Sequence, residues 1–555
     1  MIKYLYQSYL KAPFLLVFLL PLLGYAQTYP GKVGVGVDMG WNRPFVDAAK
    51  NLRSFTKPDG TAVPKDAKGW PLEDAQTVLM DMRPAAEWVG TIDDPEQFRQ
   101  NVSGTYKCSF TGQGDVTKVE GPFTVGPKSY NATTNTTSFD LTVDPPGPHH
   151  GLVVIKFTNT RRTAASALNS GFTNLKAIKP GYDAATTQLF TNEFLNALSS
   201  GRFSTIRTMG FTHTNNSNPF FPAVTEWANR KKVDDATYED DNIGHENGAP
   251  WEVIVDLANA ADVDLWINVP VAATDDYVTQ LATLIKNRLE PDRKLYVEYS
   301  NEVWNWGFLQ SVWNNEKAKT LGLNHIKNYA KRTVEIAQLF RTVFGATSLN
   351  DKVRVINAWQ IGWNPPDAMY EEQMQYINDT FGPPRNFIYG LGVAPYHNCG
   401  NACETGTVTQ ILDAMVASSD ASVVDRKKVV AVASKWQIPG GMVAYEGGSD
   451  TGGGSATNIA SKITAERAPR MKDIMVHDLR DNWFPHGGGL FMYLEVTSNY
   501  SRYGSWGLTD DVNNPDRNYK FAAVRDIVKV LRRRYVNAHI VIRPARVQGE
   551  GAALD

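Results

Sequence analysis

The chain has 555 residues, and its 56 Lys and Arg against 58 Asp and Glu give a formal net charge of −2. The apolar fraction is 42% and the aromatic fraction 11%, with 14 Trp. An ordinary apolar fraction with a low net charge argues against wholesale disorder. The near-neutral balance also argues against a nucleic-acid-binding protein that works through a basic face. The length exceeds that of one average domain.

The N-terminal segment, residues 1–26, has the pattern of a signal peptide for secretion. Lys3 and Lys11 supply positive charge, residues 12–23 are apolar, and Gly24 and Ala26 are the small residues typical of a cleavage site. A membrane anchor is the alternative, but the apolar run is shorter than the about 20 residues that a spanning helix needs. We therefore expect a secreted or periplasmic protein without stable membrane insertion.

Three cysteines and one acidic run are the remaining candidates for crosslinks and metal binding. In an oxidising compartment Cys399 and Cys403 are close enough in sequence to form a small disulfide loop, which leaves Cys108 as a buried thiol. The acidic run at residues 510–516 lacks the spacing of an EF-hand loop, so we expect a solvated turn there, with a structural calcium site as the alternative. We expect neither a metal ion nor a cofactor.

A repeating pattern of short β-prone runs and longer helical stretches begins at residue 203. Such alternation predicts parallel strands joined by right-handed crossovers. One further β-prone run follows the signal segment, which brings the number to the eight strands of a closed barrel. The expected strands cover residues 33–38, 203–209, 263–269, 295–299, 353–357, 388–394, 442–445 and 489–494, and expected helices include 277–289, 324–344 and 459–482. The fold class is therefore α/β, as a (β/α)8 TIM barrel.

The segment between the first and second expected strands is far longer than one βα unit needs. Residues 86–179 contain short β-prone pieces separated by Gly, Pro, Asn and Asp turns. This pattern predicts a small β-sandwich-like module inserted after the first barrel strand, with an irregular loop as the alternative. The expected division is a signal peptide at 1–26, the first barrel strand and following segment at 27–85, the inserted β-rich module at 86–179, the remainder of the barrel at 180–545 and a flexible tail at 546–555.

Two carboxylates stand where such a barrel places its active site, at the C-terminal ends of the strands. Glu302 follows the fourth expected strand and Glu446 ends the seventh. Cleavage of a glycosidic bond needs one carboxyl group to protonate the leaving oxygen and another to attack the sugar or activate water. The alternative for each Glu is a structural salt bridge. The separation of the carboxyl groups decides between retention and inversion of configuration, and the sequence does not show that separation.

Asn301-Glu302 after strand four, together with Glu446 after strand seven, resembles the pattern of glycoside hydrolase clan A, the retaining (β/α)8 glycosidases. Residues 299–305 also look like a group of little-characterised bacterial secreted proteins often labelled cellulose-binding. The resemblance implies that Glu302 is the acid/base, that Glu446 is the nucleophile and that Asn301 contacts the sugar 2-hydroxyl. It covers the barrel and does not extend to the inserted module.

Three further residues match positions that the clan uses. Arg207, near the end of strand two, matches an arginine that holds the nucleophile ionised, because a neighbouring cation lowers the pKa of a carboxyl group. Tyr396 and His397 follow strand six, where the clan often places a residue that touches the nucleophile or the substrate. Purely structural roles are the alternative for all three.

Strand eight departs from the clan pattern, because it lacks the Trp that many members use as the floor of the central sugar subsite. Tyr493 and Trp506 are the candidate substitutes, and Glu495 is a third carboxylate that complicates the assignment. Other residues in or near the loops of the catalytic end suit sugar binding by stacking or hydrogen bonding. They are Trp41, Trp304, Asp38 and Asn268.

The sequence thus predicts a secreted retaining glycoside hydrolase that cleaves a β-linked polysaccharide or oligosaccharide by double displacement. The expected partner is a carbohydrate substrate and not a nucleic acid. Two alternatives remain open: a non-catalytic carbohydrate-binding protein on a barrel scaffold, and an inverting glycosidase. The sequence indicates neither the sugar, the linkage nor the oligomeric state.

Overall fold

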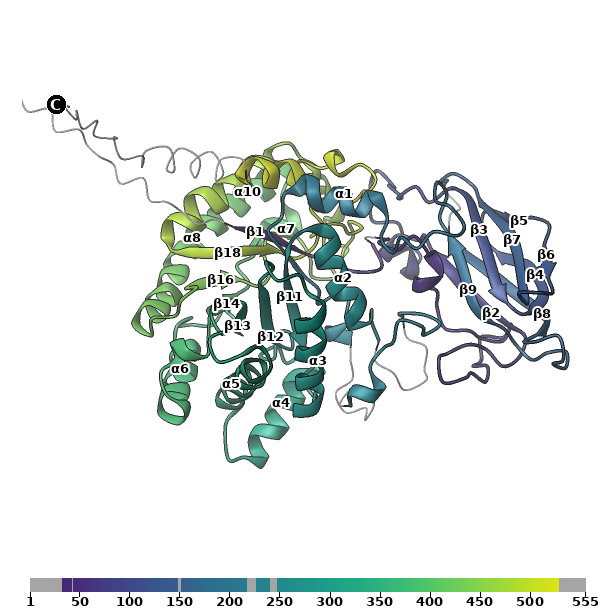
Figure 1. Ribbon diagram of the computed structural model, residues 1–555. Coiled ribbons are helices and arrows are strands. Elements are labelled where there is room, and N and C mark those ends of the chain that lie inside the picture. The colour runs from purple at the N-terminus through teal and green to yellow at the C-terminus, as the bar shows by residue number, and fades with distance from the viewer. Residues whose placement is uncertain (1–31, 42, 148–150, 217–225, 240–246, 529–555) are drawn as a thin grey trace, which may run out of the picture.

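A computed structural model describes residues 32–41, 43–147, 151–216, 226–239 and 247–528 (Figure 1). The expected signal peptide at 1–26 and the tail at 546–555 lie outside these residues. Within the described ranges, no helix combines the length and the apolar character that crossing a membrane requires.

A closed barrel of eight parallel strands forms the centre of the molecule, in the order β1-β10-β11-β12-β13-β14-β16-β18. The predicted (β/α)8 barrel is therefore confirmed. β1 pairs with both β10 and β18 and so closes the barrel. The strands are β1 (Val33–Gly36), β10 (Thr205–Arg207), β11 (Asp264–Val269), β12 (Leu295–Tyr299), β13 (Val353–Ala358), β14 (Gly390–Val393), β16 (Met442–Ala444) and β18 (Gly488–Tyr493).

Helices surround the barrel (Figure 1). They are α1 (Asn192–Gly201), α2 (Trp251–Ala261), α3 (Asp275–Arg288), α4 (Leu309–Thr320), α5 (His325–Phe344), α6 (Ala368–Phe381), α7 (Ala402–Thr405), α8 (Val408–Lys435), α9 (Ile459–Arg467) and α10 (Arg470–His477). The single helix predicted over 459–482 is wrong: it divides at Ala468 into α9 and α10. Pro469 has no backbone N–H to continue the first helix, so the chain restarts there.

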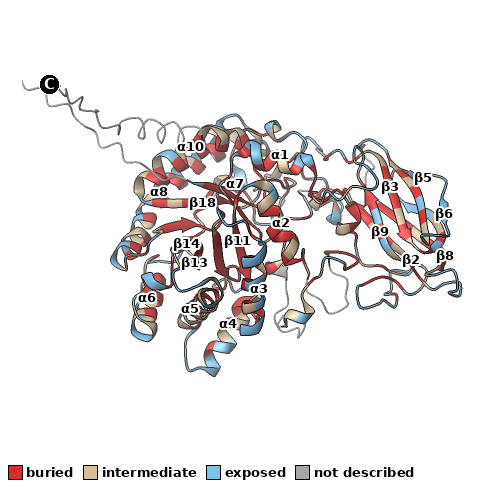
Figure 2. Cartoon of the chain, viewed as in Figure 1, coloured by how far each residue is buried: buried red, intermediate tan, exposed pale blue. Residues whose placement is uncertain are grey.

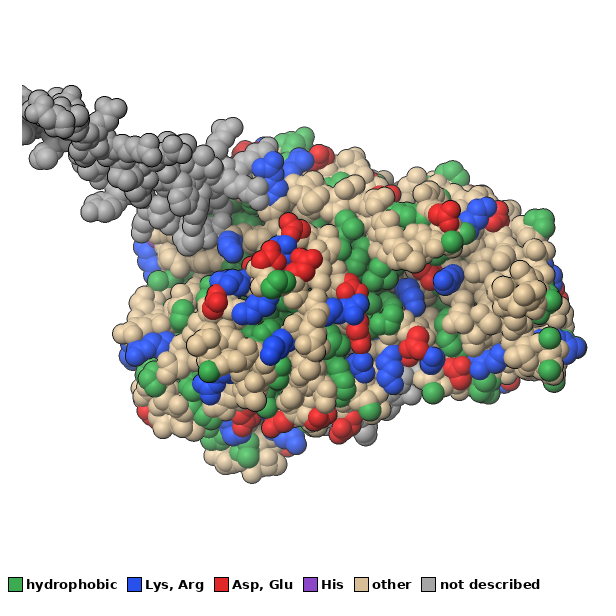
Figure 3. Space-filling view, viewed as in Figure 1, with side chains coloured by type: hydrophobic (Ala, Val, Ile, Leu, Met, Phe, Trp, Pro, Cys, Tyr) green, Lys and Arg blue, Asp and Glu red, His purple; other side chains and the backbone are tan. Residues whose placement is uncertain are grey.

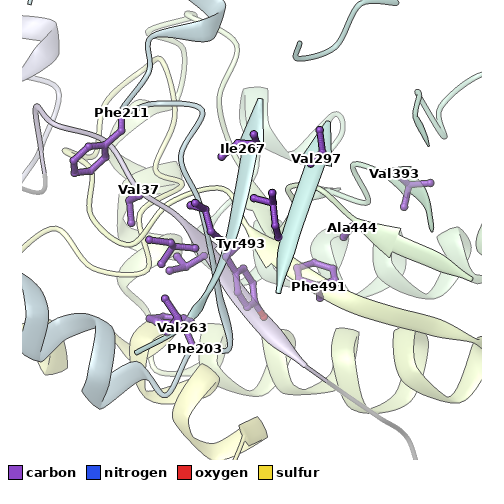
Figure 4. Close-up of a cluster of buried hydrophobic side chains, with 14 of the residues drawn as sticks. Val37, Phe203, Phe211, Val263, Ile267, Val297, Val393, Ala444, Phe491 and Tyr493 are labelled. Atoms are coloured by element: carbon purple, nitrogen blue, oxygen red, sulfur yellow. The ribbon is translucent and has the colours of Figure 1, made fainter. Parts of the chain in front are cut away.

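Two layers of buried side chains result from the alternation of residues along each barrel strand. The inner layer includes Trp266, Tyr296 and Tyr445, which come from different strands and pack together inside the barrel. Their neighbours along the strands, such as Val297 and Ala444, belong to the larger layer that the helices cover (Figure 4). The barrel strands are consequently buried along their length (Figure 2).

The chain between β1 and β10 forms two antiparallel sheets, β2-β8-β4 and β5-β7-β3-β9, with β6 beside β7. A separate buried core that includes Phe110, Phe139 and Phe157 joins them, and β7 alternates buried residues with more exposed ones (Figure 2). β2 precedes the expected module start at residue 86 and nevertheless pairs with β8. These strands are β2 (Ala75–Asp81), β3 (Gly104–Thr111), β4 (Gln113–Glu120), β5 (Phe123–Val125), β6 (Ser129–Asn131), β7 (Thr136–Val143), β8 (Leu152–Arg161) and β9 (Thr173–Ile178).

Ion pairs fasten the segment before β3 to the C-terminal part of the barrel. Arg467 Nη2 lies 2.8 Å from Asp94 Oδ2 and 2.6 Å from Asp510 Oδ2, and Arg502 Nη2 lies 2.7 Å from Asp93 Oδ1. Asp510 is buried, so the solvated turn expected at 510–516 is wrong at this residue. In the described parts of the chain, no group of three or more His, Cys, Asp or Glu side chains gathers as a metal site.

The distribution of charge on the surface and the pairing of the cysteines agree with the sequence analysis. Acidic and basic side chains are interspersed over the visible face (Figure 3). Cys399 and Cys403 form a disulfide, with a Cα–Cα distance of 5.2 Å, and Cys108 is a buried thiol, as predicted.

Candidate active site

A cavity of about 610 Å³ opens at the ends of the barrel strands and contains both predicted catalytic carboxylates, Glu302 and Glu446. Glu446 lies two residues beyond the end of β16. Glu302 lies beyond β12, where Ser300 and Glu302 adopt left-handed backbone conformations with φ of 58° and 42°. Such values are uncommon for residues other than glycine, and they mark a tight turn that holds the Glu302 side chain at the cavity.

Arg207 connects the two strands that carry these carboxylates. Its Nη1 donates to Glu446 Oε2 at 3.0 Å, while its Nε and Nη2 each donate to the carboxylate of Glu298 at 3.0 Å. Trp266 Nε1 donates to Glu298 Oε2 at 2.8 Å. The planar guanidinium is therefore fixed by a bidentate pair on one side and presents its remaining edge to Glu446.

Glu446 is 7% exposed and receives two hydrogen bonds, from Arg207 and from the hydroxyl of Tyr396, which lies 3.2 Å from Oε1. Burial and the charge of Glu302 raise the pKa of Glu446 and the Arg207 guanidinium lowers it, and together they bring it to about 7. When one of the two carboxyl groups, Glu302 or Glu446, is ionised and the other is protonated, these two donors favour the state in which Glu446 is the ionised group.

Glu302 has neutral partners instead. Asn305 Nδ2 donates to its Oε2 at 2.9 Å, and the Tyr445 hydroxyl lies 3.3 Å from its Oε1. Burial raises the pKa of Glu302, and these two hydrogen bonds partly offset that effect. Because Arg207 binds Glu446 directly, a proton shared by the two carboxyl groups is held preferentially by Glu302.

Asn301 is held in the same network. Arg207 Nη2 donates to its Oδ1 at 2.6 Å, and its Nδ2 donates to Asn215 Oδ1 at 2.8 Å. Gln310 Nε2 donates to the same Asn215 oxygen at 2.9 Å. The amide of Asn301 is thus oriented at the edge of the cavity beside Glu302.

Aromatic and acidic side chains also line the cavity. They include Asp38, Trp304, Glu495 and Trp506, four of the residues predicted to bind substrate. Burial raises the pKa of Glu495 well above its usual range, and the adjacent carboxyl group of Asp38, which is hydrogen-bonded to Glu495, raises it further. This pair therefore holds a proton and presents both donor and acceptor oxygens to the cavity.

Four predicted substrate-binding residues lie outside this cavity. His397 is fully buried, with Nδ1 3.7 Å from Asp478 Oδ2, because the short β15 (His397–Asn398) turns its ring inward. Asn268 donates to the Ser300 carbonyl at 2.7 Å and so supports the β12 loop. The Tyr493 ring is buried against Phe491, with 5.0 Å between centroids. Trp41 lines a neighbouring cavity.

Sequence reasoning missed Glu298, Asn215, Asn305 and Tyr445. Glu298 carried a usable signal, because it is a charged residue at an inward-facing position of an otherwise apolar strand. Asn305 carried another, since it follows Glu302 by three residues in the same loop. Asn215 lies in the short 3-10 helix η3 (Thr214–Asn216), and nothing in the residues around it marks its place.

No family model and no curated protein matches the chain. A solved GH51 arabinofuranosidase from Xanthomonas axonopodis pv. citri is 12% identical, with a TM-score of 0.38, and the match covers 58% of this chain and 64% of that one. A thermostable mutant of a xylanase from Cellvibrio japonicus is 11% identical, with a TM-score of 0.33 and coverage of 61% and 92%. A modular endo-β-1,4-mannanase from Cellulomonas fimi is 11% identical, with a TM-score of 0.30 and coverage of 54% and 59%.

The chain is similar in fold to glycosidases. At these identities and TM-scores the likenesses carry no conclusion about activity. The chemistry is inferred from the contacts of the cavity itself.

Proposed function

We propose that the protein is a retaining glycoside hydrolase that acts on a β-linked polysaccharide or oligosaccharide. The observation that carries the proposal is the unequal environment of two carboxyl groups in one cavity. Glu446 lies 3.0 Å from the Arg207 guanidinium, whereas the hydrogen bonds of Glu302 come from Asn305 and Tyr445. When the environments of two neighbouring carboxyl groups keep one ionised and the other protonated, the ionised group acts as the nucleophile and the protonated group as the acid.

The reaction follows from these two roles. Glu302 donates its proton to the glycosidic oxygen while the Glu446 carboxylate attacks the anomeric carbon, so that the leaving sugar departs and a glycosyl ester forms on Glu446. Glu302, now a carboxylate, takes a proton from water as the water oxygen attacks the same carbon. This second displacement releases the sugar with its original configuration and restores both groups.

The rest of the cavity suits a sugar ring. Trp304 and Trp506 offer flat apolar surfaces, and Asn301 with the Asp38–Glu495 pair offers hydrogen-bonding groups for hydroxyls. We also infer that the protein is exported, on the basis of residues 1–26. The Cys399–Cys403 disulfide supports this inference, because disulfides persist in oxidising compartments.

The deciding experiment combines turnover with labelling. The purified mature protein is assayed against aryl β-glycosides and a panel of polysaccharides, alongside Glu446→Gln, and is incubated with 2-deoxy-2-fluoro glycosides. We expect hydrolysis by the wild type, a folded but inactive variant that still binds sugar, and a covalent label on Glu446. Wild-type activity in Glu446→Gln would overturn the assignment.

The two alternatives give different results in the same samples. The anomer released first, followed by NMR, is the retained one in our proposal, and release of the opposite anomer would show an inverting mechanism. Sugar binding without turnover of any substrate would instead support a non-catalytic carbohydrate-binding protein.

A further inference from the structure

A second cavity, of about 750 Å³, lies between the barrel and the inserted module. It shares Asp38 and Gly210 with the catalytic cavity, so the two spaces adjoin each other. The module contributes β2 residues and Trp88, which lies on the short helix η2 (Ala85–Val89), while the loop after β1 contributes Trp41. A glycan chain that leaves the catalytic cavity on this side enters the second one.

Two cationic side chains in this cavity form no direct ion pair with a described carboxylate, although Asp81 attracts one of them and Glu193 the other at longer range. They are Arg43 and Lys179. Lys179 Nζ donates to the backbone carbonyl of Arg43 at 2.7 Å, and Arg43 Nη2 reaches the carbonyl of Asp81 at 3.4 Å. Arg43 Nε is buried and has no described hydrogen-bond partner.

The acidic groups of the same cavity are already engaged. Asp81 Oδ2 lies 2.5 Å from Arg53 and 2.8 Å from Arg83. Asp38 accepts from the Trp41 backbone N–H at 2.9 Å and pairs with Glu495, and Glu239 accepts from Asn51 at 3.2 Å. These carboxylates therefore do not neutralise the two cations.

The environment of the cations favours an added anion. Burial and the adjacent Arg43 lower the pKa of Lys179 to about 7, although Glu193 opposes them, and burial also lowers the pKa of Arg43. Desolvated cations that lie side by side are stabilised by a bound anion, and guanidinium and ammonium groups are the usual donors to carboxylate and sulfate oxygens.

The surrounding surface fits a sugar that carries such an anion. Trp88 is 53% exposed and lines the same cavity, with the Arg83 guanidinium 5.9 Å from the centre of its ring. The ion pairs that join Arg467 to Asp94 and Arg502 to Asp93 hold the module against the barrel, which presets the width of the cavity and limits the ordering cost of binding.

We propose that this cavity is a subsite for an anionic sugar, one that carries a carboxylate or a sulfate ester, within a glycan whose adjoining part occupies the catalytic cavity. Arg43 and Lys179 bind the anionic group, and Trp88 packs against the ring. The role of this subsite in turnover rests on the proposed glycosidase function, whereas its preference for anionic sugars does not.

The test compares three forms of one β-linked glycan with the mature protein carrying Glu446→Gln, so that no probe is consumed. The probes are cellotetraose, cellotetraose oxidised at C6 to carboxylates, and cellotetraose sulfated at C6, with affinities measured by calorimetry. We expect at least one anionic form to bind about tenfold more tightly than cellotetraose, and the tighter one identifies the group.

Three variants assign the preference to the cavity. Arg43→Gln and Lys179→Met each reduce the anionic preference severalfold, while Lys118→Gln retains it, because Lys118 is an exposed β4 residue that makes the same charge change outside the cavity. Thermal melting checks that each variant is folded. Equal affinity for all three probes would overturn the subsite, as would a preference that survives in both cavity variants.

The experiment distinguishes an error in the proposed subsite from an error in the proposed glycosidase function. A wild-type protein that hydrolyses neutral glycans, but whose Glu446→Gln form shows no anionic preference, refutes the subsite alone. A protein that prefers anionic probes through Arg43 and Lys179, yet hydrolyses neither neutral nor anionic glycans, refutes the proposed function alone.

Discussion

At the scale of single residues, one guanidinium separates the roles of two carboxyl groups. Glu302 and Glu446 line the same cavity, but only Glu446 lies within 3.0 Å of Arg207. The arginine is itself oriented by the buried Glu298, so the difference between the two carboxyl groups is fixed before any substrate arrives.

Glu302→Gln should separate the acid from the nucleophile. Loss of a general acid costs roughly 100- to 10,000-fold in rate for a sugar leaving group, whereas a dinitrophenyl glycoside needs little proton donation in its first step. We expect kcat/KM to fall by that range on natural oligosaccharides and to change little on the activated glycoside. An equal loss on both substrates would contradict the assignment of Glu302 as the acid.

The pH dependence of activity follows from the shared proton. Since burial raises the pKa of Glu446 to about 7, the pair loses its last proton near that pH, and Glu302 can then no longer act as an acid. We expect kcat/KM to fall as the pH rises through about 7, and to fall again in acid as the pair takes up its second proton. A rate that is constant between pH 4 and 9 would contradict this.

The same pKa shift predicts a change in stability. The folded protein keeps a proton that the unfolded chain loses near the ordinary value of 4.5, so the free energy of unfolding declines as the pH rises from 4.5 to about 7 and levels off above. Urea unfolding across this range measures the decline. We expect it to be smaller in Glu446→Gln, because Glu302 then has no ionised neighbour that keeps it protonated, and an equal decline in both proteins would exclude the Glu302–Glu446 pair as its source.

Much of the site could be named from the sequence because strand ends fix the places of side chains. Glu302, Glu446 and Arg207 follow or end barrel strands, and the structure gathers them. His397 could not be placed, since the strand-like turn after β14 determines on which side its ring falls. Asn215 could not be placed either, because it is held by Asn301 and Gln310 and by no local pattern.

At the scale of elements, the barrel strands were predictable and one helix was not. Each strand is a short run of apolar residues between turn signals, because both of its faces are buried. The helical pattern over 459–482 continues through Pro469 in composition, but a proline ends a helix at the residue before it. Pro469 thus marks the break in the sequence, but the apolar pattern runs across this residue and suggests one continuous helix.

Arg207 also joins elements, since it lies on β10 and binds Glu298 on β12. Arg207→Met leaves two buried carboxylates without their cation, and breaking such a buried pair costs roughly 3–5 kcal/mol. We expect a loss of that size in the free energy of unfolding by urea, together with loss of activity. Arg53→Met is the matched control, since its half-exposed pair with Asp81 contributes about 0–1 kcal/mol. Equal destabilisation by both would refute a structural role for the buried pair.

At the scale of the whole molecule, the module and the barrel meet through buried charge. The presence of an inserted module was predictable from turn residues, but its contacts were not, because Asp94 and Arg467 are far apart in sequence. In the sequence, the segment that contains Asp93 and Asp94 does not differ from an ordinary acidic loop.

Arg467→Met should loosen this junction. The substitution leaves the buried Asp510 with Arg517 alone and Asp94 without a strong partner. We expect a lower melting temperature and faster proteolysis between η2 and β3, which divides the chain into one fragment with β1 and β2 and another with β3 to β18. Lys107→Met, at an exposed pair with Asp140 within the module, serves as the control. Unchanged proteolysis in Arg467→Met would show that the pairs do not hold the module in place.

The pairing of β1 has a consequence for the order of folding. Val33, near the start of the described chain, pairs with Phe491, near its end. Among the described residues, the strands of the inserted module form sheets with one another and with no barrel strand, so that unit is complete early in synthesis. The barrel, in contrast, keeps two open edges until β18 emerges, and contacts this distant in sequence make closure the slow step of folding. A chain of this design therefore closes its barrel only after its last strand has been synthesised.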